Sequence, residues 1–438
     1  MQVKSDEKSN WFRNKNIYLT AYFIVVIAIQ VIFACLLAYE PKYDVKSLYD
    51  GAVSLAETGK LTEELMKYFA WASNNFGFAF IMSVIIKIAG VIPIISLISK
   101  NYFLIFAFTN IILVNLGVYF LYDLIRRVCG VKVAYAVLAI LFFYIPMYFF
   151  PSMIYTDTDT MWIPIVCINL FTRLRTESED ISKKKSTVFY ILIGVISGLG
   201  FVIKPTAAIM FIAITIICCV FIRKSAVYTQ IAISVALFIA VIVLFQIPYR
   251  IHVPKDIREE NSIPYTHWVM MGLQNNGQGT WEEFAKTMSF PTYAEKNANA
   301  VTAIKERLND MGVKGYVKLL GQKLGVLYSN PDLQPGGIIP FNSFDDNTSA
   351  AKLGDMRFNN TFYMVYNSIV FYGVVILAYA SIFLRNRNYT AYLAMFGMHL
   401  FFVFWEVNPR WLTNYFFVLI FLACLSVVSL GQISKNNK

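Results

Sequence analysis

Long apolar runs separated by short basic loops are the feature that most constrains this chain. The run 17–39 contains no Asp, Glu, Lys or Arg. Such a run is long enough to cross a bilayer, which takes about 20 apolar residues. Hydrophobic residues make up 57% of the 438 residues and charged residues only 15%. This pattern argues against a soluble protein and predicts an all-α polytopic membrane protein.

The net charge of +11 has a membrane explanation. The Lys and Arg residues cluster beside the ends of the apolar runs, where the positive-inside rule places them on the cytoplasmic side. We therefore expect the lipid bilayer as a partner and no nucleic acid. The basic stretch before the first run resembles a signal peptide, but the run is too long and has no small-x-small cleavage site, which predicts a retained anchor.

Cysteine placement predicts neither disulfides nor a zinc site. All six cysteines fall in apolar runs or beside a basic loop, so the predicted outer loops have none to pair.

Charge parity sets the predicted topology. Hydropathy predicts about ten spans, near 17–39, 103–125, 131–150, 160–173, 187–203, 206–222, 226–247, 362–384, 388–405 and 412–430. A further run, 76–98, is interrupted by Lys87, Gly90 and Pro93. If it crossed, basic clusters such as Arg126 with Arg127 would lie outside, so it is predicted to lie in or dip into the outer interface. The alternative is an eleventh span that violates the charge rule.

With this parity both termini are cytoplasmic and three segments face outward: 40–102, 151–159 and 249–361. The predicted organisation is an N-terminal transmembrane module (1–248) that includes the first outer loop, a long outer loop (249–361) with interfacial helices, and C-terminal transmembrane helices (362–438). One interfacial helix is expected near 314–328, with Leu320, Leu324 and Leu327 on one face.

Acidic residues at two outer positions are candidate site residues. Asp44 follows the first span, where a carboxylate partly out of water is placed to act as a base. The alternative is an ordinary solvated loop aspartate. Asp157 and Asp159 lie at the second outer turn and are suited to a hydroxyl-rich substrate or to a divalent cation as cofactor, although no third ligand is nearby in sequence. Helix capping by Thr158 or Asp159 is the alternative.

Basic residues at outward turns complete the candidate site. Lys204 and Arg410 each lie next to a proline at the end of an apolar run. Singly, each cation is explained by snorkelling to the head groups; together they indicate an anionic ligand. His267 with Trp268 is a candidate sugar site, with a packed loop histidine as the alternative.

The order of these parts resembles the GT-C fold membrane glycosyltransferases of the protein-mannosyltransferase and aminoarabinose-transferase type. The resemblance rests on one span, a loop with Asp44, Tyr49 and Ala52, the segment 74–77, Asp157 with Asp159, Lys204-Pro205-Thr206 and Pro409-Arg410. It implies an inverting transfer from a polyprenyl-phosphate sugar at the outer face of the cell membrane, with Asp44 as the catalytic carboxylate and with Arg410 and Lys204 near the lipid phosphate.

Two departures from the family pattern concern the acceptor. The first loop has no paired Asp-Glu motif and the chain has no large soluble C-terminal domain. The acceptor therefore stays open between a cell-wall, capsule or other surface glycan and a protein. Two other classes are open: a polyprenyl-linked glycan polymerase or ligase, and a lipid-glycan flippase or transporter. A transporter should have acids in the middle of its spans and repeat symmetry, which this sequence lacks, so the transferase is preferred.

Overall fold

Every regular element in the described part of the chain is a helix. The structure is a computed structural model, and it describes residues 3–91, 102–176, 182–222, 225–333, 339–340, 349, 352–353, 360–384 and 388–436. Side chains before residue 17 and after residue 432 are not described. The all-α prediction is confirmed.

The helices follow one another with short connections. The first half contains α1 (Val3–Leu36), α2 (Tyr43–Glu57), α3 (Glu63–Trp71), α4 (Ser73–Val91), α6 (Tyr102–Val128), α7 (Val131–Phe143), α8 (Thr156–Thr160), α9 (Trp162–Thr176), α10 (Lys183–Ile203) and α11 (Ile209–Ile217). The second half contains α12 (Ser225–His252), α13 (Lys255–Asn261), α14 (Tyr265–Met271), α15 (Trp281–Met288), α16 (Tyr293–Leu327), α19 (Thr361–Phe383), α20 (Tyr389–Phe404) and α21 (Phe416–Asn436). Short 3-10 turns η3 (Pro205–Ala208) and η6 (Pro409–Tyr415) precede α11 and α21.

Eight helical segments in the described residues are long and apolar enough to cross a membrane. They lie in α1, α4, α6, α10, η3 with α11, α12, α19, and η6 with α21. Three predicted spans instead coincide with shorter helices: α7 has 13 residues, α9 has 15 and α20 has 16. The protein is thus a multi-pass membrane protein, and the number of crossings stays a prediction.

The run 76–98 begins as a continuous helix. α4 passes through Lys87 and Gly90 without a break, and residues 92–98 lie outside the described residues. Its first turns pack tightly, because a Cβ on Gly77 would lie 2.5 Å from the carbonyl oxygen of Val202 in α10. Length and composition alone allow α4 to cross, so the choice between a span and an interfacial helix stays open.

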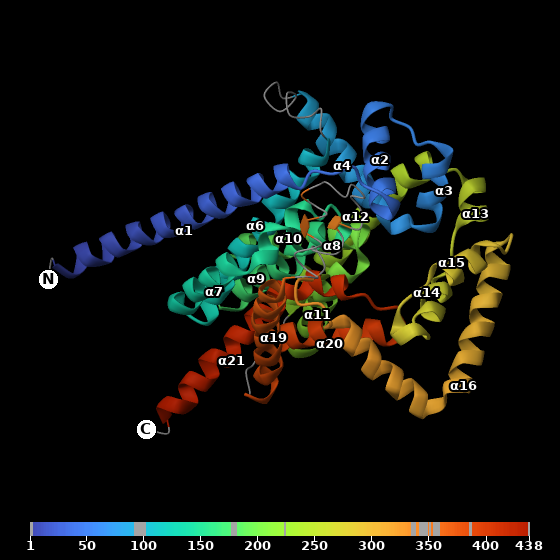
Figure 1. Cartoon of the computed structure of the whole chain (residues 1–438). Helices are drawn as coiled ribbons and strands as arrows, with labels where there is room; N and C mark the ends of the chain where they lie inside the picture. Colours follow the sequence, from blue (N-terminus) through green and yellow to red (C-terminus); the bar gives the residue numbers. More distant parts are fainter. Residues whose placement is uncertain are drawn as a thin grey trace.

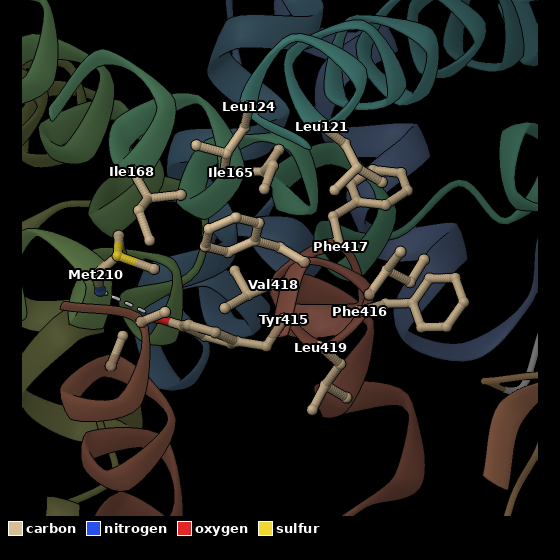
Figure 2. Close-up of a cluster of buried hydrophobic side chains, with 14 of the residues drawn as sticks. Leu121, Leu124, Ile165, Ile168, Met210, Tyr415, Phe416, Phe417, Val418 and Leu419 are labelled. Atoms are coloured by element: carbon tan, nitrogen blue, oxygen red, sulfur yellow. Dashed lines mark hydrogen bonds between the residues drawn. The ribbon is translucent and has the colours of Figure 1, made fainter. Parts of the chain in front are cut away.

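Two hydrophobic cores hold the bundle together. The larger one joins α6, α7, α9, α11, α20 and α21, and Figure 2 shows its centre, where the side chains of Leu121, Ile165 and Phe417 meet. The second core packs α2, α3 and α4 against the beginning of α6 around Phe69 and Phe106. In contrast, α12 buries only 11% of its most apolar window, as a lipid-facing helix would.

The outer segment is built from α13, α14, α15 and α16. The predicted helix near 314–328 is confirmed as the second part of α16, after a kink at Gly312. Its faces differ from the prediction: Lys323 is buried, whereas Leu324 is 48% exposed. Lys323 turns inward because its ammonium donates to the carbonyl oxygens of Phe402, Val403 and Trp405 at the end of α20, at 2.7 to 3.2 Å.

The helices α13 to α16 lie at one side of the molecule and both chain ends lie at the other (Figure 1). The boundary predicted after residue 248 falls inside α12, which continues through Pro248 to His252. Proline removes one hydrogen bond, but ending the helix there would expose more unpaired backbone groups to hydrocarbon.

Close packing of α10 on α12 gives a test of the fold. Gly194 and Gly198 have the small-xxx-small spacing that lets membrane helices approach closely. A Cβ on Gly194 would lie 2.3 Å from the carbonyl oxygen of Ser234. Gly194→Ala should therefore destabilise the protein by about 1–3 kcal/mol, as overpacking does. The measurement is the melting temperature in detergent.

The matched control is Gly373→Ala in α19, where the added methyl group meets no atom within 4 Å. This variant should melt at or slightly above the wild-type temperature, because alanine is the better helix former. Equal melting temperatures for the two variants would contradict the α10–α12 packing.

Candidate active site

A cavity of about 510 Å³ lies where α2, α4, α10, α12, α14 and η6 meet. One end is polar and is lined by Asp44, Lys204, Glu406 and Arg410. The other end is apolar and is lined by side chains of α4, α10 and α12, including Phe76, Phe201, Val202, Ile242 and Phe245. The cavity is therefore amphipathic, with its charges at one end, and its size is that of a small-molecule site.

Asp44 lies in the first turn of α2, where the helix dipole favours a negative charge. The residue before it, Tyr43, has a φ of +52°, a conformation that non-glycine residues seldom adopt and that occurs at functional sites. Burial raises the pKa of Asp44, while the Arg410 guanidinium and a hydrogen bond from Tyr155 act in the opposite direction. The Tyr155 hydroxyl donates to Asp44 Oδ2 over 3.4 Å.

Asp157 holds two cations at the polar end. It is fully buried in α8, forms an ion pair with Lys204, and lies 3.7 Å from Arg410 Nε through Oδ2. Arg410 also lies over the Tyr155 ring, with 4.5 Å from Cζ to the ring centroid. One carboxylate therefore faces two cations, and the group carries a net positive charge toward the cavity.

Local sequence fixes both cations. Lys204 ends α10 in an extended conformation (φ −152°, ψ 108°), as the residue before a proline does. Asn408 caps η6 by accepting from the Arg410 N–H at 3.2 Å, and Pro409 occupies the first turn, where its missing N–H costs nothing.

Tyr415 joins the two cationic turns. Its hydroxyl donates to the Thr206 carbonyl oxygen at 3.0 Å and accepts from the Met210 N–H at 3.1 Å. The second of these bonds is drawn in Figure 2. Tyr415 is fully buried, so the turn after Lys204 and the turn that carries Arg410 are held together inside the core.

The predicted site residues divide into two groups. Asp44, Lys204 and Arg410 line one cavity, although they are far apart in sequence. Asp157 lies behind the cavity wall, where it orients the two cations. Asp159 is also buried and does not line the cavity; burial raises its pKa well above the usual value, which favours the neutral acid. Neither Thr158 nor Asp159 caps a helix, because both lie inside α8.

His267 lies in a packed cluster away from the cavity. It is fully buried in α14, its Nδ1 is 2.8 Å from Thr287 Oγ1, and its ring packs against Trp268 and Phe284. Burial lowers its pKa to about 4, assisted by the Arg307 charge. The packed loop histidine is therefore the alternative that the geometry favours, whereas the neighbouring Trp268 does line the cavity.

The described residues do not fit the divalent cation expected at Asp157 and Asp159. Asp157 is already occupied by two cations, and no group of three or more His, Cys, Asp or Glu side chains in the described part of the chain is arranged to hold a metal. The mechanism considered below therefore has no step through a metal.

Three cavity residues were not found from the sequence: Tyr155, Trp405 and Glu406. Glu406 lies four residues before Arg410 in the same outward turn, so its position was a usable signal. Burial raises its pKa to about 7, with Arg410 acting in the opposite direction. Tyr155 and Trp405 gave no signal, because aromatic residues are common at the ends of spans.

The fold and cavity define a multi-pass membrane protein with cations at the polar end of an amphipathic site. The chain belongs to the family described as conserved hypothetical integral membrane protein, whose model matches residues 2–330. No curated protein sequence matches the chain.

Two solved structures are similar in fold. They are crystal structures of ArnT from Cupriavidus metallidurans, one bound to undecaprenyl phosphate and one in the apo state. Each has a TM-score of 0.40 and 11% sequence identity to this chain. Each match covers 94% of this chain, and 77% and 78% of the respective ArnT chains.

The Asp157–Lys204 pair gives a prediction about stability that is independent of function. Asp157→Asn and Lys204→Met should each destabilise the protein by about 3–5 kcal/mol, because each leaves a buried charge without its partner. The double variant should lose clearly less than the sum of the two, as measured by thermal melting in detergent. Additive losses would contradict direct pairing.

Proposed function

We propose that the protein is a membrane glycosyltransferase of the GT-C type that moves a sugar from a polyprenyl-phosphate donor to a hydroxyl acceptor. The observation that carries the proposal is that Asp44 and the cations Lys204 and Arg410 line one cavity whose other end is apolar. A polyprenyl-phosphate sugar has the same order of parts: an apolar chain, a charged phosphate and a polar ring.

Arg410 and Lys204 bind the phosphate in this proposal. A guanidinium offers a planar pair of donors that matches phosphate oxygens, and an ammonium adds a point charge. Arg410 Nε has no hydrogen-bond partner among the described residues. Because Asp157 neutralises only one of the two cations, one positive charge is left for the ligand. The same cations stabilise the phosphate as it leaves.

Asp44 is the general base. The acceptor oxygen attacks the anomeric carbon from the face opposite the phosphate, and the bond between that carbon and the phosphate oxygen breaks. The phosphate departs with the bonding electrons, and the hydroxyl proton passes to Asp44. Configuration at the anomeric carbon is inverted. The raised pKa of Asp44 makes it a better proton acceptor than a solvated aspartate.

The cavity faces the outside of the cell membrane in this proposal. The positive-inside rule puts the basic loops and both termini in the cytoplasm. Both chain ends lie at the side of the molecule away from α13 to α16, which is the arrangement that this orientation requires (Figure 1). The acceptor, a surface glycan or a protein, is then reached from outside.

Loss of the gene in the source organism should cause a polyprenyl-phosphate sugar to accumulate, as identified by mass spectrometry of lipid extracts. Wild-type protein should restore the normal level. Asp44→Asn, which keeps the shape and removes the charge, should lower transfer at least about 100-fold, the usual size of a general-base contribution. The wild-type rate should also fall as the pH drops through the raised pKa of Asp44, because the protonated acid cannot accept a proton.

The two roles separate in one binding assay. Asp44→Asn should bind undecaprenyl phosphate in nanodiscs as the wild type does, whereas Arg410→Lys should bind it more weakly because an ammonium cannot reproduce the planar fork. The controls are Asp50→Asn, a partly exposed aspartate on the same helix, and Arg250→Lys, an exposed arginine at the end of α12. Near wild-type transfer by Asp44→Asn, or unchanged lipid affinity in Arg410→Lys, would overturn the assignment.

A further inference from the structure

Glu406 presents a carboxylate to the cavity on the side away from Asp157. It lines the cavity and makes no ion pair or hydrogen bond with any residue that the structure describes. The proposed transfer gives it no role, since Asp44 accepts the proton and the cations bind the phosphate. A partly buried carboxylate with no protein partner is suited to accept hydrogen bonds from a ligand.

The position of Glu406 is fixed from two sides. Gly279 leaves the space that the carboxylate fills, because a Cβ there would lie 2.5 Å from Glu406 Oε2. Gly272 allows α14 to lie directly on the Trp405–Glu406 peptide, where a Cβ would come within 2.7 Å of the Trp405 carbonyl oxygen. The glycines therefore shape the surroundings of one carboxylate.

Backbone contacts hold the same segment on either side of Glu406. Lys323 Nζ donates to the Trp405 carbonyl oxygen at 2.7 Å. The Val407 N–H donates to the Gly277 carbonyl oxygen, also at 2.7 Å. Such support from surrounding residues is what a preorganised binding group requires.

Aromatic rings form the wall beside this carboxylate. Trp268 and Trp405 both line the cavity and lie nearly parallel, with 21° between their planes and 6.4 Å between their centroids. Phe401 stacks on Trp405 from another side at 5.2 Å and fixes its ring. Flat apolar faces next to a hydrogen-bond acceptor suit a ring that is apolar on one face and carries hydroxyl groups at its edge.

We propose that Glu406, Trp268 and Trp405 form a subsite for an uncharged pyranose ring. The tryptophans contact the C–H face of the sugar, and Glu406 accepts hydrogen bonds from its hydroxyl groups. A sugar that carries a carboxylate is disfavoured, because Glu406 and Asp44 would both repel it. The role of the subsite in transfer rests on the proposed function, and the ring comes either from the donor or from the acceptor.

The probes are the methyl α-pyranosides of glucose, mannose and galactose, with glucuronate and glucosamine as charged comparators. Binding to the full chain in nanodiscs is followed by saturation-transfer NMR. At least one neutral pyranoside should bind more tightly than either charged sugar. Glu406→Gln should weaken its binding about tenfold, because hydrogen bonds to a charged acceptor are the stronger ones. Glu259→Gln, at an exposed glutamate of α13, should leave binding unchanged.

Folding of the Glu406 variant is checked by its melting temperature. If Glu406→Gln does not fold, Trp268→Leu gives the second test and should also weaken pyranoside binding. The subsite is overturned if no neutral pyranoside binds, if a charged sugar binds as tightly as the best neutral one, or if the folded variant binds like the wild type.

The source of the ring is found by competition. If undecaprenyl phosphoglucose displaces the pyranoside and undecaprenyl phosphate does not, the subsite holds the donor sugar. If neither lipid displaces it, the subsite holds the acceptor; either result supports the subsite. Displacement by both lipids would put the sugar in the phosphate site and overturn the proposal. Failure of undecaprenyl phosphate to bind would contradict the proposed function alone, because pyranoside binding is measured without lipid.

Discussion

The buried ion pair between Asp157 and Lys204, with Arg410 beside it, is the interaction on which the site depends. A buried charge has to be paired, so three segments that are distant in sequence must meet at one carboxylate. Tyr415 adds neutral hydrogen bonds that hold the two cationic turns together. The chain thereby keeps two cations near hydrocarbon while leaving part of their charge for a ligand.

The same rule operates in a second cluster. The buried Asp123 in α6 accepts hydrogen bonds from Arg126, Arg127 and Arg173 at 2.6 to 2.8 Å, and from Asn169 at 3.1 Å. Here the carboxylate orients three guanidiniums, and the cluster contains no hydroxyl-bearing or aromatic wall comparable with that of the cavity. Two basic clusters around one aspartate each therefore have different surroundings, and only the one at Asp157 adjoins an apolar pocket with a second carboxylate.

The all-helical membrane fold could be predicted from the sequence because hydropathy and charge parity depend on local composition. Asp44, Lys204 and Arg410 could be proposed because charged residues at the ends of spans are few. The pairing of Asp157 with Lys204 could not, since it depends on how α8 lies against α10. His267 was misleading for a related reason: a histidine looks the same in sequence whether it faces a cavity or packs behind a tryptophan. The place of Glu406 depends on two glycines more than 120 residues away in sequence.

The most direct test of the central claim is the location of bound lipid. A polyprenyl phosphate that carries a diazirine near its phosphate is photo-crosslinked to the protein in nanodiscs, and the adducts are mapped by mass spectrometry. The account predicts adducts within 201–206 and 405–411 that are reduced in Arg410→Lys. Adducts concentrated instead around Arg126, Arg127 and Arg173, and unchanged in that variant, would contradict it.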